Sequence, residues 1–295
     1  MRMTTVLITG GTGFLGSNVL KVLLENDYHV VLLKRKNSSL HRIKDCINRI
    51  EVLVLENIDW DKLFADRAIN VIVHCATNYG RINTSSIEVI DANLILPLRL
   101  LEFGVKYGVK CFVNSDTILN SRINFYSLSK KQFLQWFCNF SKQLVCVNVE
   151  IEHFYGPNDD PTKFVIAIVR QLLSDKKEIL LTKGEQERYF VYIDDVVAAF
   201  KLVIDKSQTW KNGFYRYQIG SDTSITIKDF VERIKVLTGN MDTELKFGAV
   251  PYRKNETMIP KINTREIKKL GWKTTVDVDE GLRKTISAER CLKRQ

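Results

Sequence analysis

A tyrosine and a lysine, Tyr126 and Lys130, lie four residues apart in a segment that is expected to open a helix. This spacing is about one helical turn, so the phenol and the ammonium face the same way. The reference pKa of tyrosine, about 10, is too high for easy proton exchange at neutral pH, and an adjacent cation lowers it by stabilising the phenolate. The pair therefore predicts proton transfer with an alcohol or ketone oxygen.

A hydroxyl that could complete this site is provided by Ser115, which follows the strand-like run Phe112–Asn114. The carboxyl ends of parallel strands meet at the ligand-binding edge of a sheet, so we expect Ser115 to lie near the tyrosine and lysine. A hydroxyl donor, a proton donor and a cation form a ketone–alcohol site. We predict the catalytic set Ser115, Tyr126 and Lys130.

A glycine-rich turn, Thr9–Gly16, lies between the strand-like Val6–Ile8 and the helical pattern of Asn18–Glu25. Glycines at its three key positions permit a tight turn, close approach to a pyrophosphate and close helix–strand packing, while the helix N-terminus attracts the anion. A structural turn is the alternative, but the strand–turn–helix context favours dinucleotide binding. The residues predicted to bind the cofactor here are Gly10, Thr12, Gly13, Phe14, Leu15 and Gly16.

Two cations, Lys34 and Arg35, end the second predicted strand. A site for NAD usually has an acidic residue here, which holds the ribose 2′-hydroxyl, whereas a 2′-phosphate requires cations. The pair therefore favours NADP(H) over NAD(H), although two solvated surface charges would look the same.

The elements that must position these residues alternate between strand-like and helix-like segments in the first half of the chain. Apolar strands separated by amphipathic helices predict an α/β fold, a Rossmann-type doubly wound parallel sheet, followed by a smaller C-terminal α/β substrate domain. We place the NADP-binding domain at 1–155, with a returning segment near 188–220, and the substrate domain mainly at 156–295. The cleft between the domains is the expected active site. The segments expected as strands or helices include His29–Leu33, Ile50–Leu55, Asn70–Cys75, Asp91–Tyr107, Lys110–Asn114, Phe164–Leu173, Arg188–Ile193, Asp195–Ile204, Tyr215–Ile219, Thr226–Leu237 and Val278–Ile286.

The composition excludes several classes of protein. A hydrophobic fraction of 45% and a charged fraction of 26% over 295 residues are typical of a packed globular chain. The net charge of +10 arises from scattered cations, which suits a phosphate-bearing small ligand better than nucleic acid. No apolar run approaches membrane-spanning length. The 6 cysteines and 4 histidines show no disulfide framework or metal-ligand spacing, so we expect no metal and a cytoplasmic location.

Taken together, the motifs resemble those of extended short-chain dehydrogenases/reductases of the nucleotide-sugar epimerase, dehydratase and reductase group, from Gly10 to about Gly281. Within that group the chain looks most like CDP-abequose and CDP-paratose synthases. The segments that carry the resemblance, beyond the turn and the catalytic set, are His74–Ala76, Ala76–Gly80, Asp91–Leu98 with Asn93, Glu152–Pro157, Gly184–Asp195 and Leu270–Trp272.

The resemblance implies further site residues. Asn57 and Ile58 would contact the adenine, and Ala76 and Thr77 would line the cofactor. The residues that would meet the nucleotide sugar are Thr77, Asn78, Ser115, Asp116, His153, Arg188 and Arg253. Glu150 departs from the arginine common at its position, and only ten residues separate Ser115 from Tyr126, so the identity of the substrate stays open.

The function implied is NADPH-dependent reduction of the C4 ketone of a nucleotide-linked 4-keto-deoxysugar. The substrate would resemble CDP-4-keto-3,6-dideoxyglucose, giving CDP-abequose or CDP-paratose, or would be a dTDP-4-keto-6-deoxysugar, for lipopolysaccharide O-antigen. A homodimer is expected. The alternatives are an NAD-dependent nucleotide-sugar 4-epimerase and, more remotely, an NADP-sensing or RNA-binding protein on the same scaffold, although such proteins commonly lose the tyrosine or lysine.

Overall fold

The computed structural model describes residues 3–81, 84–174 and 176–293, and its contacts divide the chain into two units. The first unit comprises Met1–Ile151 and Val197–Gln218, and the second comprises Glu152–Val196 and Ile219–Gln295. The returning segment therefore begins later than predicted, at Val197. The reason is that the strands around Arg188 pair with strands of the second unit, as described below.

The first unit is built on a seven-stranded sheet in the order β11-β6-β5-β4-β1-β2-β3. The pairings from β6 to β3 are all parallel, and the chain winds outward in both directions from β1, which confirms the predicted Rossmann-type sheet. Every residue of β1, β4, β5 and β6 is buried, as expected for a sheet covered on both faces. The strands are β1 (Thr5–Thr9), β2 (His29–Lys34), β3 (Glu51–Val54), β4 (Val71–His74), β5 (Cys111–Thr117), β6 (Val145–Ile151) and β11 (Gly213–Ile219).

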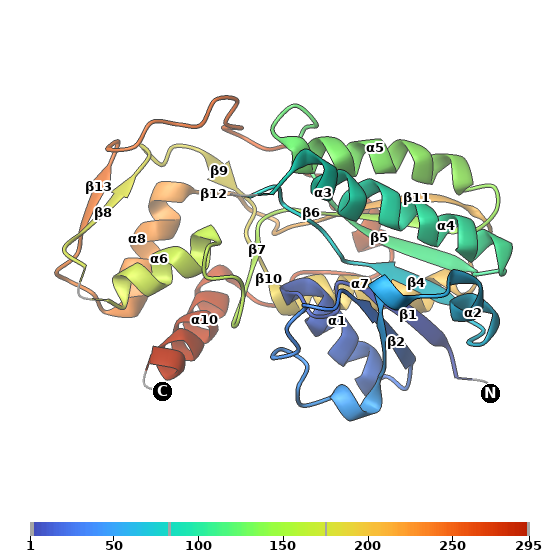
Figure 1. Cartoon of the computed structure of the whole chain (residues 1–295). Helices are drawn as coiled ribbons and strands as arrows, with labels where there is room; N and C mark the ends of the chain where they lie inside the picture. Colours follow the sequence, from blue (N-terminus) through green and yellow to red (C-terminus); the bar gives the residue numbers. More distant parts are fainter. Residues whose placement is uncertain (1–2, 82–83, 175, 294–295) are drawn as a thin grey trace. The chain divides into compact units, whose positions relative to one another are not determined.

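Helices cover the two faces of this sheet, with α4 and α5 on one face and α1 and α7 on the other (Figure 1). The predicted helix Asp91–Tyr107 is part of a longer helical run that contains a π-helical turn at Asp91–Ile95. The helices of the first unit are α1 (Phe14–Glu25), α2 (Trp60–Ala65), α3 (Ser86–Ile90), α4 (Leu96–Lys106) and α5 (Phe125–Phe140), together with most of α7 (Ile193–Ser207). Short 3-10 turns lie at Ile47–Arg49 and Leu55–Asn57.

The aromatic stripe of α5 is divided between core and surface. Phe133 and Phe137 are fully buried and pack against Phe112 of β5, with the rings of Phe112 and Phe137 centred 5.2 Å apart. Trp136, on the other side of the helix, is 52% exposed. The stripe therefore anchors α5 to the sheet and leaves one large apolar side chain at the surface.

Two strands differ from the sequence-based prediction. β5 continues to Thr117, so Ser115 lies inside the strand and not after it. β6 was not among the expected strands, because Asn148 and Glu150 interrupt its apolar pattern. Both side chains are buried nonetheless, since Asn148 pairs with Asn114 of β5 and Glu150 pairs with Lys131 of α5.

The second unit consists of helices and three short strand pairs. The predicted strand Arg188–Ile193 is in fact two strands, β9 (Glu187–Arg188) and β10 (Val191–Tyr192). β9 pairs with β12 (Ile225–Thr226), β10 with β7 (Phe154–Tyr155), and β8 (Glu178–Leu181) with β13 (Glu244–Phe247). The helices are α6 (Phe164–Leu172), α8 (Ile227–Thr238), α9 (Arg265–Lys269) and α10 (Val278–Lys293).

A buried polar contact fixes the segment before α10. The indole Nε1 of Trp272 donates to the carbonyl of Asp195 at 2.8 Å, and the Asp195 carboxylate accepts from the backbone N–H groups of Thr275 and Val276. Trp272 is only 4% exposed, so its indole packs in the core of the second unit.

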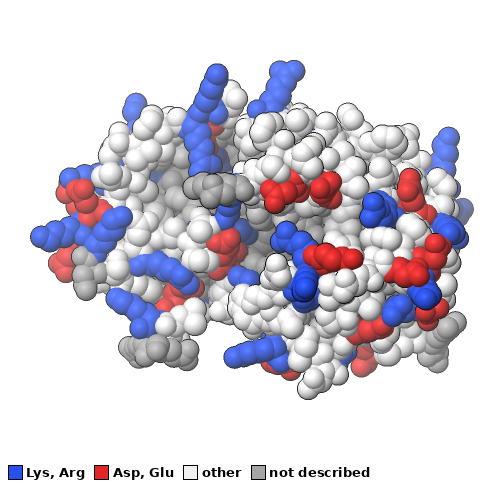
Figure 2. Space-filling view, in the orientation of Figure 1, with Lys and Arg blue, Asp and Glu red and all other residues white. Residues whose placement is uncertain are grey.

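The surface mixes both signs of charge. On the face drawn in Figure 2, lysine and arginine side chains are interspersed with aspartate and glutamate. Within the described ranges, no helix combines the length and the apolar character needed to cross a bilayer.

Candidate active site

The glycine turn joins β1 to α1 in a conformation that side chains would prevent. Gly10 has φ +70°, and a Cβ there would lie 2.4 Å from the backbone nitrogen of Ala76. A Cβ on Gly16 would lie 2.2 Å from the carbonyl oxygen of Gly10. Gly13 caps α1 without any side-chain hydrogen bond to the first turn, and it is exposed. The turn thus presents backbone N–H groups at a helix N-terminus, as an anion site requires.

The two cations after β2 behave differently. The Lys34 ammonium donates to the carbonyls of Arg35 and Lys36, at 2.9 and 3.1 Å, so it closes its own loop. Arg35 is exposed. Lys34 and Arg35 were both predicted to bind the 2′-phosphate. The Lys34 side chain bonds to its own loop, whereas the Arg35 side chain does not.

The segments after β3 and β4 lie at the same carboxyl edge of the sheet as the glycine turn. Asn57 ends the 3-10 turn after β3 and is exposed, while Ile58 is half-buried. Ala76 follows β4, and its N–H approaches the Thr9 hydroxyl at 3.4 Å. Asn57, Ile58 and Ala76 therefore lie at the edge of the sheet where the cofactor is predicted to bind. Their contacts with a cofactor stay predictions.

Asn93 connects the segment after β4, at the carboxyl edge of the sheet, to α5 through hydrogen bonds. Its Oδ1 accepts from the Thr77 hydroxyl at 3.1 Å and from the Asn78 N–H at 2.8 Å. Its Nδ2 donates to the Asn78 carbonyl and to the Ser129 hydroxyl of α5. Asn93 is buried in the π-helical turn, a local geometry that often marks functional sites. It bonds to backbone and also positions the 77–78 segment relative to α5.

Tyr126 lies in the first turn of α5, which is fixed by a capping box between Asn124 and Ser127. Its ring packs against that of Tyr79, with centroids 5.0 Å apart. Burial, assisted by Tyr79 and Asp116, raises the pKa of Tyr126 well above its ordinary value. The predicted lowering of this pKa by Lys130 is therefore not the dominant effect.

Lys130, one turn later, is buried with 1% exposure. Burial lowers the pKa of Lys130 to about 8, although the charge of Asp116 partly opposes this shift. Its Nζ has no hydrogen-bond partner in the part of the chain that the structure describes. A buried ammonium without acceptors is costly, so this atom is suited to a ligand that supplies them.

The hydroxyl that the structure places at Tyr126 belongs to Thr117, the last residue of β5. The Thr117 side chain lies near enough to Tyr126 to lower its pKa slightly, against the larger effect of burial, and Thr117 Oγ1 accepts from the Leu119 N–H at 3.2 Å. Ser115 donates instead to the carbonyl of His74 at 3.0 Å, inside the sheet. Thr117 is therefore a second candidate hydroxyl, and the catalytic role of Ser115 stays a prediction. The sequence did not point to Thr117 because the predicted strand ended at Asn114.

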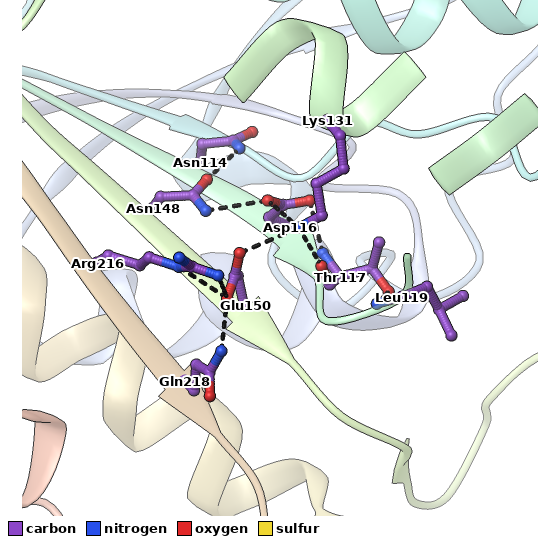
Figure 3. Close-up of polar contacts among 9 residues, drawn as sticks. All are labelled: Asn114, Asp116, Thr117, Leu119, Lys131, Asn148, Glu150, Arg216 and Gln218. Atoms are coloured by element: carbon purple, nitrogen blue, oxygen red, sulfur yellow. Dashed lines mark hydrogen bonds and ion pairs between the residues drawn. The ribbon is translucent and has the colours of Figure 1, made fainter. Parts of the chain in front are cut away.

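Asp116 does not face a substrate, contrary to the prediction. Its side chain is fully buried: Oδ1 accepts from the Thr117 N–H at 2.7 Å, and Oδ2 accepts from Lys131 and Asn148 at 3.0 and 2.9 Å (Figure 3). Alternation along β5 explains this, because successive side chains of a strand point to opposite faces of the sheet.

The predicted phosphate ligands His153, Arg188 and Arg253 all belong to the second unit. His153 is half-exposed, with Nδ1 3.3 Å from Glu152 Oε1. Arg188 is nearly buried; its guanidinium pairs with Glu256 and donates to the Thr257 carbonyl at 2.8 Å. Arg253 is exposed. Arg188 therefore holds the 256–257 segment against β9, and binding a phosphate would require Glu256 to move.

The residues fit a nicotinamide dinucleotide. The turn at Gly10 and Gly16 excludes side chains where a pyrophosphate would approach, and the buried Lys130 ammonium needs the kind of acceptor that ribose hydroxyls provide. Among the described residues, no cluster of three or more His, Cys, Asp or Glu side chains could hold a metal ion.

Comparison with known proteins adds a family to this geometry. Residues 6–220 match the NAD dependent epimerase/dehydratase family. The chain belongs to this family. Its curated relatives include the CDP-abequose synthase of Salmonella typhimurium, which is 30% identical over 95% of this chain and 97% of its own length. Another is the dTDP-4-dehydro-6-deoxyglucose reductase of Escherichia coli, 26% identical over 98% of this chain and 99% of its own length.

Solved structures of the NAD dependent epimerase/dehydratase family share the fold. The UDP-glucuronic acid 4-epimerase of Bacillus cereus, in complex with UDP-glucuronic acid and NAD, superposes with a TM-score of 0.85 at 21% identity, covering 98% of this chain and 100% of that one. The resemblance predicted from the motifs is confirmed, and this member of the family is an NAD(P)-dependent oxidoreductase.

Proposed function

We propose that this enzyme reduces the C4 ketone of a nucleotide-linked 4-keto-deoxysugar with NADPH. The substrate class is that of CDP-4-keto-3,6-dideoxyglucose, giving CDP-abequose or CDP-paratose, or of a dTDP-4-keto-6-deoxysugar. The observation that carries the proposal is the placement of Tyr126 in α5 one helical turn from the buried Lys130, whose ammonium has no hydrogen-bond partner among the described residues. The likeness to CDP-abequose synthase supports the choice of substrate.

Tyr126 donates the proton to the oxygen of the ketone. Its raised pKa keeps the phenol protonated at neutral pH, which is the form needed in the direction of reduction. Thr117 Oγ1 accepts from the Leu119 N–H, so its own hydrogen is available to the ketone oxygen as negative charge develops there. NADPH, when bound, supplies the hydride to C4.

Lys130 binds the hydroxyls of the nicotinamide ribose. With a pKa of about 8 it is mainly protonated at neutral pH, so it holds these acceptors as a cation. The glycine turn holds the pyrophosphate, and Asn57 and Ile58 contact the adenine. Arg35 meets the 2′-phosphate, which gives the preference for NADP(H) over NAD(H).

The residues that hold the nucleotide sugar are those that the family resemblance implies. Thr77 and Asn78, whose backbone and hydroxyl are fixed by Asn93, contact the sugar. His153 and Arg253 bind the diphosphate, and Arg188 joins them once Glu256 is displaced. The enzyme acts as a homodimer, for which the exposed apolar side chains of Leu128 and Trp136 on α5, at 40% and 52% exposure, offer contacts.

The experiment is to follow NADPH oxidation with CDP- and dTDP-4-keto-deoxysugars and to read the C4 configuration of the product by NMR. We expect one NADPH consumed per sugar reduced, with NADH a poorer donor. The matched control is the same enzyme with the corresponding 4-hydroxy sugar, which should oxidise no NADPH. A purified protein that carries NAD and interconverts C4 epimers without added cofactor would instead make it a 4-epimerase.

A further inference from the structure

Two acidic residues lie directly opposite each other on neighbouring strands beneath the candidate site. In the parallel register of β5 and β6, Asp116 pairs with Glu150 and Asn114 pairs with Asn148. Both carboxylate side chains are fully buried. Like charges directly opposite in a sheet are destabilising, so this pair requires a cation.

Lys131 of α5 supplies that cation. Its ammonium donates to Asp116 Oδ2 and Glu150 Oε1, both at 3.0 Å, and to the carbonyl of Thr117 at 2.5 Å (Figure 3). An ammonium has three hydrogens, and each has an acceptor here. Lys131 thus spans β5, β6 and α5.

The second acid is also bound from the edge of the sheet. Glu150 Oε2 accepts from Arg216 and Gln218 of β11, at 2.9 and 2.8 Å. Burial by itself would raise the pKa of Glu150, but Lys131, Gln218 and Arg216 outweigh it and hold the pKa below its ordinary value. Two carboxylates therefore face two cations, and the network is neutral as a whole.

The network forms hydrogen bonds with both backbone polar groups of Thr117, its N–H and its carbonyl. Asp116 Oδ1 accepts from its N–H at 2.7 Å, and Lys131 donates to its carbonyl. Lys131 follows Lys130 on the same helix that carries Tyr126. The Lys131 side chain therefore connects the end of β5, which carries the Thr117 hydroxyl, to α5, which carries Tyr126.

We propose that Lys131 is a positioning residue for the reduction, which holds the Thr117 hydroxyl at Tyr126 by clamping the end of β5 to α5 through Asp116. Glu150 serves this clamp by fixing the lysine from the other side. The inference rests on the proposed function, because it assigns Thr117 to the reacting oxygen.

The test is a double-mutant cycle between Lys131 and Thr117. Lys131→Met alone would leave two opposed acids, so the cycle is made in a Glu150→Gln background. Together, Glu150→Gln and Lys131→Met remove one charge of each sign. In that background we expect Lys131→Met to lower kcat by about tenfold to a hundredfold, since a misplacement of about 1 Å can cost a hundredfold. The KM for NADPH should change little, because the cofactor residues are not held by this lysine.

The decisive comparison is the same substitution after Thr117→Val. If Lys131 acts through the Thr117 hydroxyl, Lys131→Met should then lower kcat by no more than about twofold, because interacting sites are not additive. Equal fold-losses with and without the hydroxyl would overturn the proposal. Lys131→Arg should restore most of the rate. Lys201→Met, which breaks a half-exposed ion pair with Asp205 on α7, is the control and should leave kcat unchanged.

The proposed function is tested separately, by assaying the wild-type enzyme. If it reduces no 4-ketosugar, the reductase assignment fails, and the clamp is then tested by crystal structures of the Glu150→Gln and Glu150→Gln/Lys131→Met variants. The clamp requires the Thr117 hydroxyl to move away from the Tyr126 hydroxyl by about 1 Å in the second variant. An unchanged position would exclude it.

Discussion

Asp116 and Glu150 face each other across β5 and β6, and the ammonium of Lys131 hydrogen bonds to one oxygen of each at 3.0 Å. A buried pair of acids this close is stable only with a cation and further donors. Here the donors are supplied by α5 and β11, so the packing of α5 on the sheet and the pairing of β11 with β6 are tied to the charge state of this network (Figure 3).

Tyr126→Phe removes the proposed proton donor. We expect kcat for ketosugar reduction to fall by about a hundredfold or more, the usual contribution of a general acid. NADPH binding should be retained, because the ring and its contact with Tyr79 are preserved. Steady-state kinetics and NADPH fluorescence titration measure the two effects. Tyr215→Phe, which loses only a hydroxyl contact to a backbone carbonyl, is the control; near-normal turnover of Tyr126→Phe would contradict the assignment.

Thr117→Val and Ser115→Ala distinguish the two candidate hydroxyls. Thr117→Val should lower kcat by about a hundredfold or more, as for loss of a donor to a developing oxyanion. Ser115→Ala should leave kcat within about threefold and lower the free energy of unfolding by about 1 kcal/mol, because it removes a buried bond to the His74 carbonyl. Kinetics and urea unfolding on both variants decide, and the reverse order of effects on kcat would restore Ser115.

Lys130 makes the stability of the cofactor-free protein depend on pH. Burial lowers its pKa from 10.5 to about 8 in the folded state, so the folded protein carries a penalty below pH 8 that disappears as pH rises to 10.5. The shift corresponds to about 3 kcal/mol. Lys130→Met should therefore be more stable than wild type at pH 7 by an amount of this order, and the gap should close by pH 10.5. Denaturant unfolding across this range measures it; a gap independent of pH would contradict a buried ammonium.

The same group should control cofactor binding above neutral pH. The ammonium is lost as pH rises through about 8, so kcat/KM for NADPH should fall above that pH in the wild-type enzyme. In the Lys130→Met variant, kcat/KM for NADPH should be low at every pH and should show no fall above pH 8. A pH–rate profile of both proteins with saturating sugar provides the measurement.

Arg35→Ala should weaken the preference for NADP(H). Loss of a guanidinium from the 2′-phosphate is expected to raise the KM for NADPH about tenfold and to leave that for NADH nearly unchanged. Lys34→Ala is the matched comparison, and its effect should be smaller because the Lys34 ammonium already bonds to two carbonyls of its own loop. Equal changes with both cofactors would show that Arg35 does not meet a 2′-phosphate.

The sequence by itself determined the sheet, the glycine turn that joins β1 to α1 and the helical face shared by Tyr126 and Lys130. These are local signals: the turn at Gly10 and Gly16 tolerates no side chain, and Tyr126 and Lys130 share a face of one helix whatever surrounds them. The apolar runs of β1, β2 and β4 likewise carry their own pattern, since a strand covered on both faces is apolar throughout.

Only the tertiary structure showed that Thr117 lies near Tyr126 and that Asp116 is buried in a network with Lys131. In the sequence, polar residues look like the ends of the apolar runs: Asn114 and Asp116 in β5, and Asn148 and Glu150 in β6. For this reason β5 was predicted too short and β6 was not predicted. Folding buries these polar residues because the register brings them opposite one another and Lys131 arrives from α5 to neutralise the acids. Such long-range pairing leaves no mark in either strand's own pattern, so Thr117 could be placed at the site only once the strands and the helix had been packed together.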